Sequence, residues 1–249
     1  MPVDACGVGD DTDVATEAGL RALLTGGRLG STFRPVVRLH TGAVQGFMAA
    51  LHPLGWPADR SVAALVRVAA RFGLELELAR AALRCAATRP PPGELFVGVP
   101  IGMLLAPGGA EEVAATFAVA GVSPTRVVVH LRLGEAPWDE VVAAAAECAR
   151  HELRVAISGV STTGPMIRLD AVAPSYVILD RAADDEQSMA ALAGHVSSLR
   201  ARCPGGLSEI VASGVETRSA AAALAEAGVD LAQGRFFGNV LQTCAPTSP

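Results

Sequence analysis

The chain has 249 residues and a net charge of −5, with 51% hydrophobic and 18% charged residues. This length is sufficient for one large core. The acidic balance and the lack of a basic stripe argue against a surface for nucleic acid. No apolar run reaches the length of a membrane span, and the acidic N-terminus lacks the order of a signal peptide. We therefore expect a cytoplasmic protein that does not contact the membrane.

Two features of the composition restrict the chemistry further. All 20 basic residues are arginine, so a lysine base, a Schiff base and a P-loop are excluded. The five cysteines are far apart and form no C-x-x-C pair, which argues against a zinc site or a disulfide framework. These are Cys6, Cys85, Cys148, Cys203 and Cys244.

The N-terminal part predicts a tail, a helix and a hairpin. We expect a disordered acidic tail over residues 1–15 and a short helix over 14–24, closed by Gly26 and Gly27. The β-branched run 33–39 and the apolar segment 43–51 flank a three-residue turn with a glycine. A turn this short predicts that the first strand pair is antiparallel.

The remaining sequence alternates between strand and helix patterns. Helices are predicted at 59–72, 75–88, 111–120, 138–151, 165–171, 187–202 and 217–227. Strands are predicted at 94–99, 126–131, 154–160, 176–180, 209–212 and 229–232. With the hairpin this makes about eight strands, the number that closes an α/β barrel of the (β/α)8, TIM-like type. We expect one domain over residues 16–242 and a disordered tail over 243–249.

Several of these segments resemble EAL domains, the cyclic-di-GMP phosphodiesterase family. FRPVVRLHTGAVQGF (33–47) resembles the family's opening strand, glycine turn and second strand. YVILDR (176–181) is similar to its Lys-Ile-Asp strand, SEIVASGVET (208–217) to its Ala-Glu-Gly-Val-Glu-Thr element, and QGRFFG (233–238) to its ending. The order and spacing are preserved from about residue 20 to 241. The resemblance implies a (β/α)8 TIM-like barrel of EAL type.

The same resemblance implies that most of the family's catalytic positions have changed. The metal-binding glutamate of the family signature corresponds to Met48, and the catalytic lysine to Ile178. The altered positions are Met48, Gly98, His130, Leu133, Ser158, Gly159, Ile178 and Ser213. Gln233 is retained from that set, with Asp180 and Glu216 beside it. The family's loop after the paired aspartates reads VSTT (160–163), so the resemblance gives no support for the family's usual dimer.

Barrel chemistry takes place at the carboxyl ends of the strands, and two divalent cations need several oxygen ligands there. The predicted strand ends supply one carboxylate, Asp180, and one imidazole, His130. We therefore expect no Mg²⁺ or Mn²⁺ and no hydrolysis of cyclic-di-GMP. Ser158 and Ser213 also lie at strand ends, but the sequence assigns no base beside either, which argues against a nucleophilic hydrolase.

Two binding roles follow from this reading. The first is a catalytically inactive regulatory module that contacts an unidentified protein, such as a transcription factor, a sensor or another EAL-type chain. The alternative is a metal-independent receptor for cyclic-di-GMP or another anionic nucleotide, with residual phosphodiesterase activity least favoured. The receptor site would contain Arg34, His52, Asp180, Gln233 and Arg235, where arginines replace neutral groups of the family. Arg34 and Arg235 could instead point to solvent or pair with Asp180 and Glu216.

Overall fold

The structure is a computed structural model that describes residues 16–54, 62–134, 136–160, 169–179, 186–202, 208–238 and 241–244. Its helices are α1 (Glu17–Thr25), α2 (Val62–Arg71), α3 (Glu75–Thr88), α4 (Ile101–Leu105), α5 (Gly109–Val119), α6 (Trp138–Arg150), α7 (Leu169–Val172), α8 (Glu186–Arg202) and α9 (Arg218–Glu226). Two short 3-10 helices are η1 (Pro124–Arg126) and η2 (Arg235–Phe237). Its strands are β1 (Leu29–Arg38), β2 (Val44–Pro53), β3 (Glu94–Gly98), β4 (Val127–Arg132), β5 (Arg154–Ser158), β6 (Tyr176–Leu179), β7 (Glu209–Ala212), β8 (Leu231–Ala232) and β9 (Leu241–Cys244).

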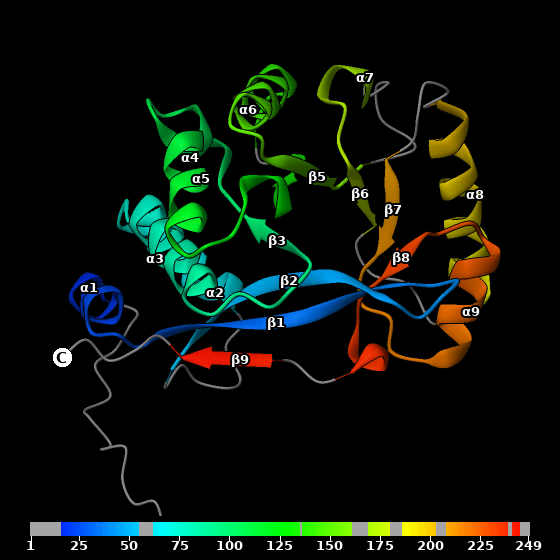
Figure 1. The fold of residues 1–249 in the computed structure, drawn as a ribbon, viewed down its shortest axis with the longest axis horizontal. Coiled ribbons are helices and arrows are strands. Elements are labelled where there is room, and N and C mark those ends of the chain that lie inside the picture. Colours follow the sequence, from blue (N-terminus) through cyan, green and yellow to red (C-terminus); the bar gives the residue numbers. More distant parts are fainter. Residues whose placement is uncertain are drawn as a thin grey trace, which may run out of the picture.

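Strands β1 to β8 form a closed ring within the described ranges. The strand order runs from β2 through β8 to β1, and β1 pairs back onto β2. Neighbouring pairs from β2 to β8 are parallel, whereas β1 is antiparallel to both of its neighbours in the ring. This confirms the predicted barrel and its antiparallel first pair. In Figure 1, β1 and β2 run side by side across the molecule, with α1 to α3 at one end and α8 and α9 at the other.

The ring is closed by a short contact between β8 and β1. Only Val37 and Arg38 of β1 pair with β8, because β8 has two residues. The earlier part of β1, from Gly30 to Phe33, pairs instead with β9. Residues 243 and 244 therefore lie in a strand, although the sequence analysis placed them in the C-terminal tail. The free edge of β1 explains this difference, since an unpaired strand edge attracts another strand.

Local sequence accounts for several element boundaries. The side chain of Thr217 accepts a hydrogen bond from the backbone N–H of Ala220 and so caps α9, as its position before an alanine-rich segment predicts. Thr16 caps α1 in the same way through Gly19. Helix α3 has the predicted bounds, and the sequence analysis missed α4, which follows Pro100 directly. The predicted start of the helix at 59–72 lies outside the described residues, which resume at Val62.

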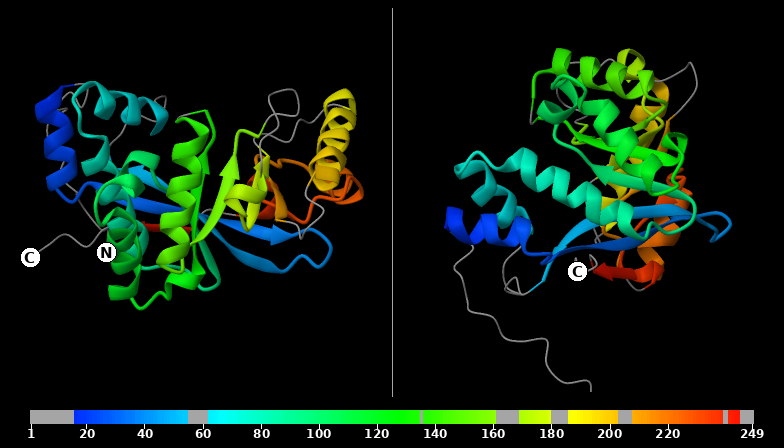
Figure 2. Two further views of the ribbon diagram at one scale, coloured as in Figure 1. Left: turned by 90° about the horizontal axis from the view of Figure 1, so that it is seen from above. Right: turned by 60° about the vertical axis from the view of Figure 1, so that its left-hand side comes forward.

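The barrel contains two apolar layers. A small cluster fills its interior and consists of Val36, Phe96, Val128, Ala156, Tyr176, Ile178, Val211 and Leu231, with Met48 packed against it. A larger cluster joins the outer faces of the strands to the surrounding helices and is rich in Ala, Val and Leu. Figure 2 shows these helices around the strands from two further directions. The interior cluster is the reference from which the polar side chains at either end can be placed.

A network of charged and polar side chains closes the amino-terminal end of the barrel. The carboxylate of Glu94 accepts hydrogen bonds from Arg154, from the hydroxyl of Tyr176 and from Gln45, the last at 3.1 Å. The Tyr176 side chain is fully buried, and burial together with Glu94 raises its pKa above the ordinary value. On the other side of this end, Arg38 donates to Glu209 at 2.7 Å. These contacts satisfy polar groups that would otherwise be costly to bury.

Candidate functional site

The carboxyl ends of the parallel strands form the mouth of the barrel. Because side chains alternate along a strand, the residue two positions beyond an interior-cluster residue faces the same way, one level nearer the mouth. This rule places the following residues in one ring: Gly98 beyond Phe96, His130 beyond Val128, Ser158 beyond Ala156, Ser213 beyond Val211 and Gln233 beyond Leu231. Met48 and Ile178 lie one level deeper, in contact with the interior cluster itself.

Strand β1 runs in the opposite direction, so its amino end reaches the mouth. Arg34 precedes the interior residue Val36 by two positions and lies directly opposite Met48 in the β1–β2 register. The side chain of Arg34 is exposed, and it makes no hydrogen bond or ion pair with the described residues. Arg34 therefore places a guanidinium at the rim of the mouth that has no partner among the described residues.

Two neighbouring strands supply a hydrogen-bonded pair at the mouth. The distance between His130 Nε2 and Ser158 Oγ is 2.8 Å. The sequence analysis assigned no base to Ser158, and the structure corrects this. The pairing follows from the stagger of β4 and β5, in which His130 lies opposite Ala156 and Arg132 lies opposite Ser158. A register prediction for these two strands would have found it.

The His130–Ser158 pair lacks what a nucleophile needs. Ser158 is fully buried, so its hydroxyl is not exposed to a substrate from solvent. The backbone carbonyl of Ser158 also accepts from the N–H of Leu133 at 2.9 Å, which fixes the strand end. Gly159 follows with φ of 77°, a conformation that favours glycine. We interpret His130 and Ser158 as a polar pair that stabilises the wall of the mouth.

Gln233 and Ser213 form a second pair across β7 and β8. Gln233 Nε2 donates to Ser213 Oγ at 3.0 Å, and the backbone N–H of Gln233 donates to Ala212 at 2.8 Å. The other side-chain atom, Gln233 Oε1, is buried and has no hydrogen-bond partner in the described structure. A buried acceptor without a partner is costly, and it marks a position where a donor from a ligand or water would bind favourably.

The other predicted ligand residues do not all reach the mouth. Arg235 forms an ion pair with Glu216 on the exposed side of η2, as the salt-bridge alternative predicted. His52 lies far along β2, opposite Gly30, and is half-buried. Asp180 and most of the loop that begins at Val160 lie outside the described residues. The sequence analysis missed Arg132, an exposed arginine that shares the inner face of β4 with His130.

The described part of the mouth does not suit a divalent cation. No three His, Cys, Asp or Glu side chains gather anywhere among these residues in a way that could hold a metal ion. At the mouth, the side chains of Met48, Ser158 and Ser213 offer a thioether and two hydroxyls, and Gly98 offers no side chain. Mg²⁺ and Mn²⁺ prefer carboxylate oxygens. The residues therefore do not fit the pair of cations that the family resemblance implies.

No helix in the part of the chain that the structure describes has the length and hydrophobicity needed to cross a membrane.

Near the mouth, the described strands β1 and β4 contribute three basic side chains to the inner face: Arg34, His130 and Arg132. A site of this composition can hold an anion or form polar contacts with a partner.

Comparison with known proteins supports the same fold. No curated protein matches the chain. A phosphodiesterase, PaMucR, solved as a c-di-GMP complex, is 18% identical, with a TM-score of 0.77 over 90% of this chain and 96% of that one. The FimX EAL domain from Pseudomonas aeruginosa, bound to c-di-GMP, is 19% identical, with a TM-score of 0.75 over 95% and 100%. The EAL domain of Mycobacterium smegmatis DcpA is 19% identical, with a TM-score of 0.66 over 86% and 93%.

At this level of identity the structural likeness establishes the fold alone. The family model described as the EAL domain, however, matches residues 17–239, which is most of the chain. Together with the closed ring and its reversed first strand, this match leads to one conclusion: the chain belongs to the EAL domain family.

Proposed function

We propose that this chain is a catalytically inactive EAL domain that acts as a regulatory binding module in signalling, chiefly through contacts with another protein. One observation carries the loss of catalysis. It is supported by the residues at the described strand ends near the mouth, none of which supplies a carboxylate: Gly98, His130, Ser158, Ser213 and Gln233. Hydrolysis by two cations needs several hard oxygen ligands to hold the metal ions and activate water.

The polar groups that remain at the mouth support the same proposal. Ser158 is bonded to His130, and Ser213 is bonded to Gln233. These hydrogen bonds between side chains stabilise the ends of the strands and so preserve the barrel as a scaffold. A binding role requires the folded barrel but not the metal-binding side chains, because a surface that contacts another protein depends on the fold and not on the catalytic residues.

The test of inactivity is direct. The pure protein is incubated with cyclic-di-GMP and either Mg²⁺ or Mn²⁺, and the linear product is measured by chromatography. We expect no product above that of buffer. Metal-dependent product that disappears in a His130→Ala, Gln233→Ala double variant would refute the proposal, since turnover by a contaminant would be unchanged by those substitutions.

The protein-binding role is tested by size-exclusion chromatography with light scattering, using the chain alone and mixed with purified EAL-type or sensor proteins from the same organism. A complex of fixed stoichiometry that forms without any nucleotide supports the role. A complex that forms only when cyclic-di-GMP is added would instead favour the receptor described next.

A second candidate function is a metal-independent receptor for an anionic nucleotide. It is favoured by Arg34, an exposed arginine on the inner face that has no partner among the described residues, and by Arg132 on the same face of β4. The buried, unpartnered Gln233 Oε1 offers an acceptor for a base or hydroxyl donor. Structural neighbours of this chain were solved with c-di-GMP bound.

Calorimetric titration with cyclic-di-GMP in a chelating buffer separates the two roles. The receptor predicts binding that Arg34→Ala abolishes and that Arg235→Ala leaves nearly unchanged, because Arg235 is already paired with Glu216. Arg84→Ala, which removes an exposed arginine from α3, is the matched control. Absence of heat with the wild-type chain would refute the receptor and leave the protein-binding role.

A further inference from the structure

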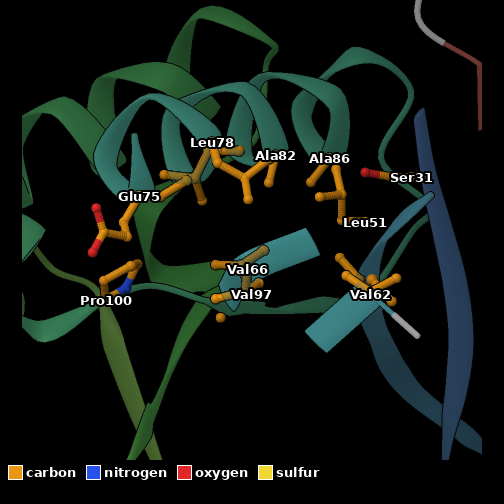
Figure 3. Close-up of a pocket in the computed structure, with 15 residues that line it drawn as sticks. Ser31, Leu51, Val62, Val66, Glu75, Leu78, Ala82, Ala86, Val97 and Pro100 are labelled. Carbon is orange, nitrogen blue, oxygen red and sulfur yellow. The ribbon is translucent and has the colours of Figure 1, made fainter. Parts of the chain in front are cut away.

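A second hollow lies outside the barrel, between its wall and the helices α2 and α3. The cavity has a volume of about 280 Å³. One wall is the outer face of β2 and the end of β3, and the other is formed by the helices. Figure 3 shows Leu78, Ala82 and Ala86 of α3 above the cavity, Val62 and Val66 of α2 in front, and Val97 below.

The shape of this cavity follows from the sequence of α3. The helix faces the sheet with a run of small side chains, Ala79, Ala82 and Ala86, interrupted by Leu78 and Leu83. The space is partly open to solvent, and Val66 on its wall is 48% exposed, so it is a cleft beside the barrel and not a sealed void. Three alanines opposite the small Ala49 leave a space that neither layer fills. With the apolar lining, this space suits an apolar ligand.

The two ends of the cavity differ in chemistry. Glu75 lies beside Pro100 at one end, and Ser31 lies at the other (Figure 3). Glu75 forms no ion pair or hydrogen bond with the described residues. Pro100 has no backbone N–H, so it cannot donate a hydrogen bond to the carboxylate of Glu75 beside it. An apolar chamber with a carboxylate at one end is complementary to a molecule with an apolar body and one positive charge.

We propose that this cavity is a binding site for a small amphipathic cation, an alkyl or aryl ammonium whose apolar part lies between α3 and β2 and whose charge meets Glu75. In liquid water each molecule takes up about 30 Å³, so the cavity volume equals that of about nine water molecules. An alkyl chain of about ten carbons has a similar volume. The cavity adjoins the mouth at Gly98, but Glu75 and the residues of α2 and α3 that line it are not mouth residues, so the proposal does not depend on the function proposed above.

The chain-length dependence of binding tests the chamber. Calorimetry is carried out with primary alkylammonium ions from butyl to tetradecyl, below their micelle concentrations. Affinity should rise about fourfold per methylene and stop rising near ten carbons, when the chamber is full. Affinity that rises without limit indicates non-specific adsorption and overturns the proposal. No binding at any length overturns it as well.

Three variants test the assignment of the residues. Glu75→Gln should remove the preference for octylammonium over octanol, a preference of about two- to fivefold for a partly exposed pair. Glu77→Gln is the matched control, because Glu77 is exposed and also lies in the first turn of α3, where both carboxylates favour the helix. Ala82→Leu fills the chamber and should weaken both probes at least tenfold.

Circular dichroism and thermal unfolding confirm that each variant is folded. If Ala82→Leu fails to fold, the smaller Ala82→Val serves in its place. Equal loss of the ammonium preference in Glu75→Gln and Glu77→Gln would overturn the role of Glu75. Unchanged affinity in the folded Ala82 variant would overturn the location of the site.

Discussion

Replacing Glu94 should destabilise the barrel more than any surface ion pair can. Its carboxylate is the acceptor shared by Arg154, Tyr176 and Gln45 at the amino-terminal end of the barrel. Glu94→Leu removes that acceptor, so the buried hydroxyl of Tyr176 has no group to donate to, although it still accepts from Arg154 at 3.5 Å. Glu94→Gln retains an amide that can accept from Arg154 and donate to the Tyr176 oxygen, so its effect should be smaller.

The magnitude follows from the burial of each partner. A buried donor without an acceptor costs about 1–3 kcal/mol, and the Tyr176 side chain is fully buried. The side chain of Arg154 is 34% exposed and that of Glu94 15% exposed, so water replaces part of the lost ion pair, which adds at most about 1 kcal/mol. We expect Glu94→Leu to lower the free energy of unfolding by about 1–4 kcal/mol, and Glu94→Gln by about 1 kcal/mol or less.

Urea unfolding at neutral pH, followed by circular dichroism, measures these differences. In a domain of this size, the loss in Glu94→Leu corresponds to a fall in melting temperature of roughly 2–16 °C. The control is Glu112→Gln, which breaks the exposed pair with Arg80 and should cost less than about 1 kcal/mol. The reasoning is refuted if Glu94→Leu is no less stable than this control.

Three further predictions concern other parts of the chain. Gly234→Ala should lower the free energy of unfolding by more than about 3 kcal/mol in the same urea assay, because a Cβ there would lie 1.9 Å from the carbonyl oxygen of Val215. Gly98→Ala is the control, since Gly98 has open space around it, and equal stability of the two variants would contradict the prediction. Cys148 should resist iodoacetamide in the folded protein near pH 8 and react after unfolding, because burial raises the pKa of its thiol to about 12. Labelling is measured by mass spectrometry, and rapid labelling of the folded protein would contradict the burial of this thiol. The protein should lose stability in alkali because the folded-state pKa of Tyr176 is raised, so the unfolded chain loses the tyrosine proton first. The free energy of unfolding should therefore fall as the pH rises above about 10, and this fall should be less steep in Tyr176→Phe.

The sequence was sufficient for most of the fold because the barrel depends on local signals. The hairpin turn fixed the direction of β1, and the alternation of apolar runs with capped, alanine-rich segments located the helices. β9 was missed because a strand that only fills a free edge carries no strong pattern of its own. The short helix α4 was missed for a related reason, since five residues are too few for a helical period to be recognised.

The candidate site could be predicted only in part. The sequence placed Met48, Gly98, His130, Ser158, Ser213 and Gln233 at strand ends, and the structure brings Ser158 to His130 and Gln233 to Ser213. Those contacts depend on the stagger between neighbouring strands, which residue types do not reveal. Arg132 was overlooked because the predicted strand ended at residue 131, one residue before the end of β4. Arg235 and Glu216 lie outside the strands, where no regular spacing predicts a contact, so their pairing could be stated only as an alternative.

The short contact between β8 and β1 has a consequence for how the ring assembles. Its two residue pairs join segments on the order of two hundred residues apart in sequence, the kind of distant pairing that slows folding. During synthesis the first hairpin emerges long before β8 exists, so one edge of β1 must wait uncovered, at risk of aggregation, until the last strands leave the ribosome. The C-terminal strand β9 covers Gly30 to Phe33 of the same edge and adds to the protection.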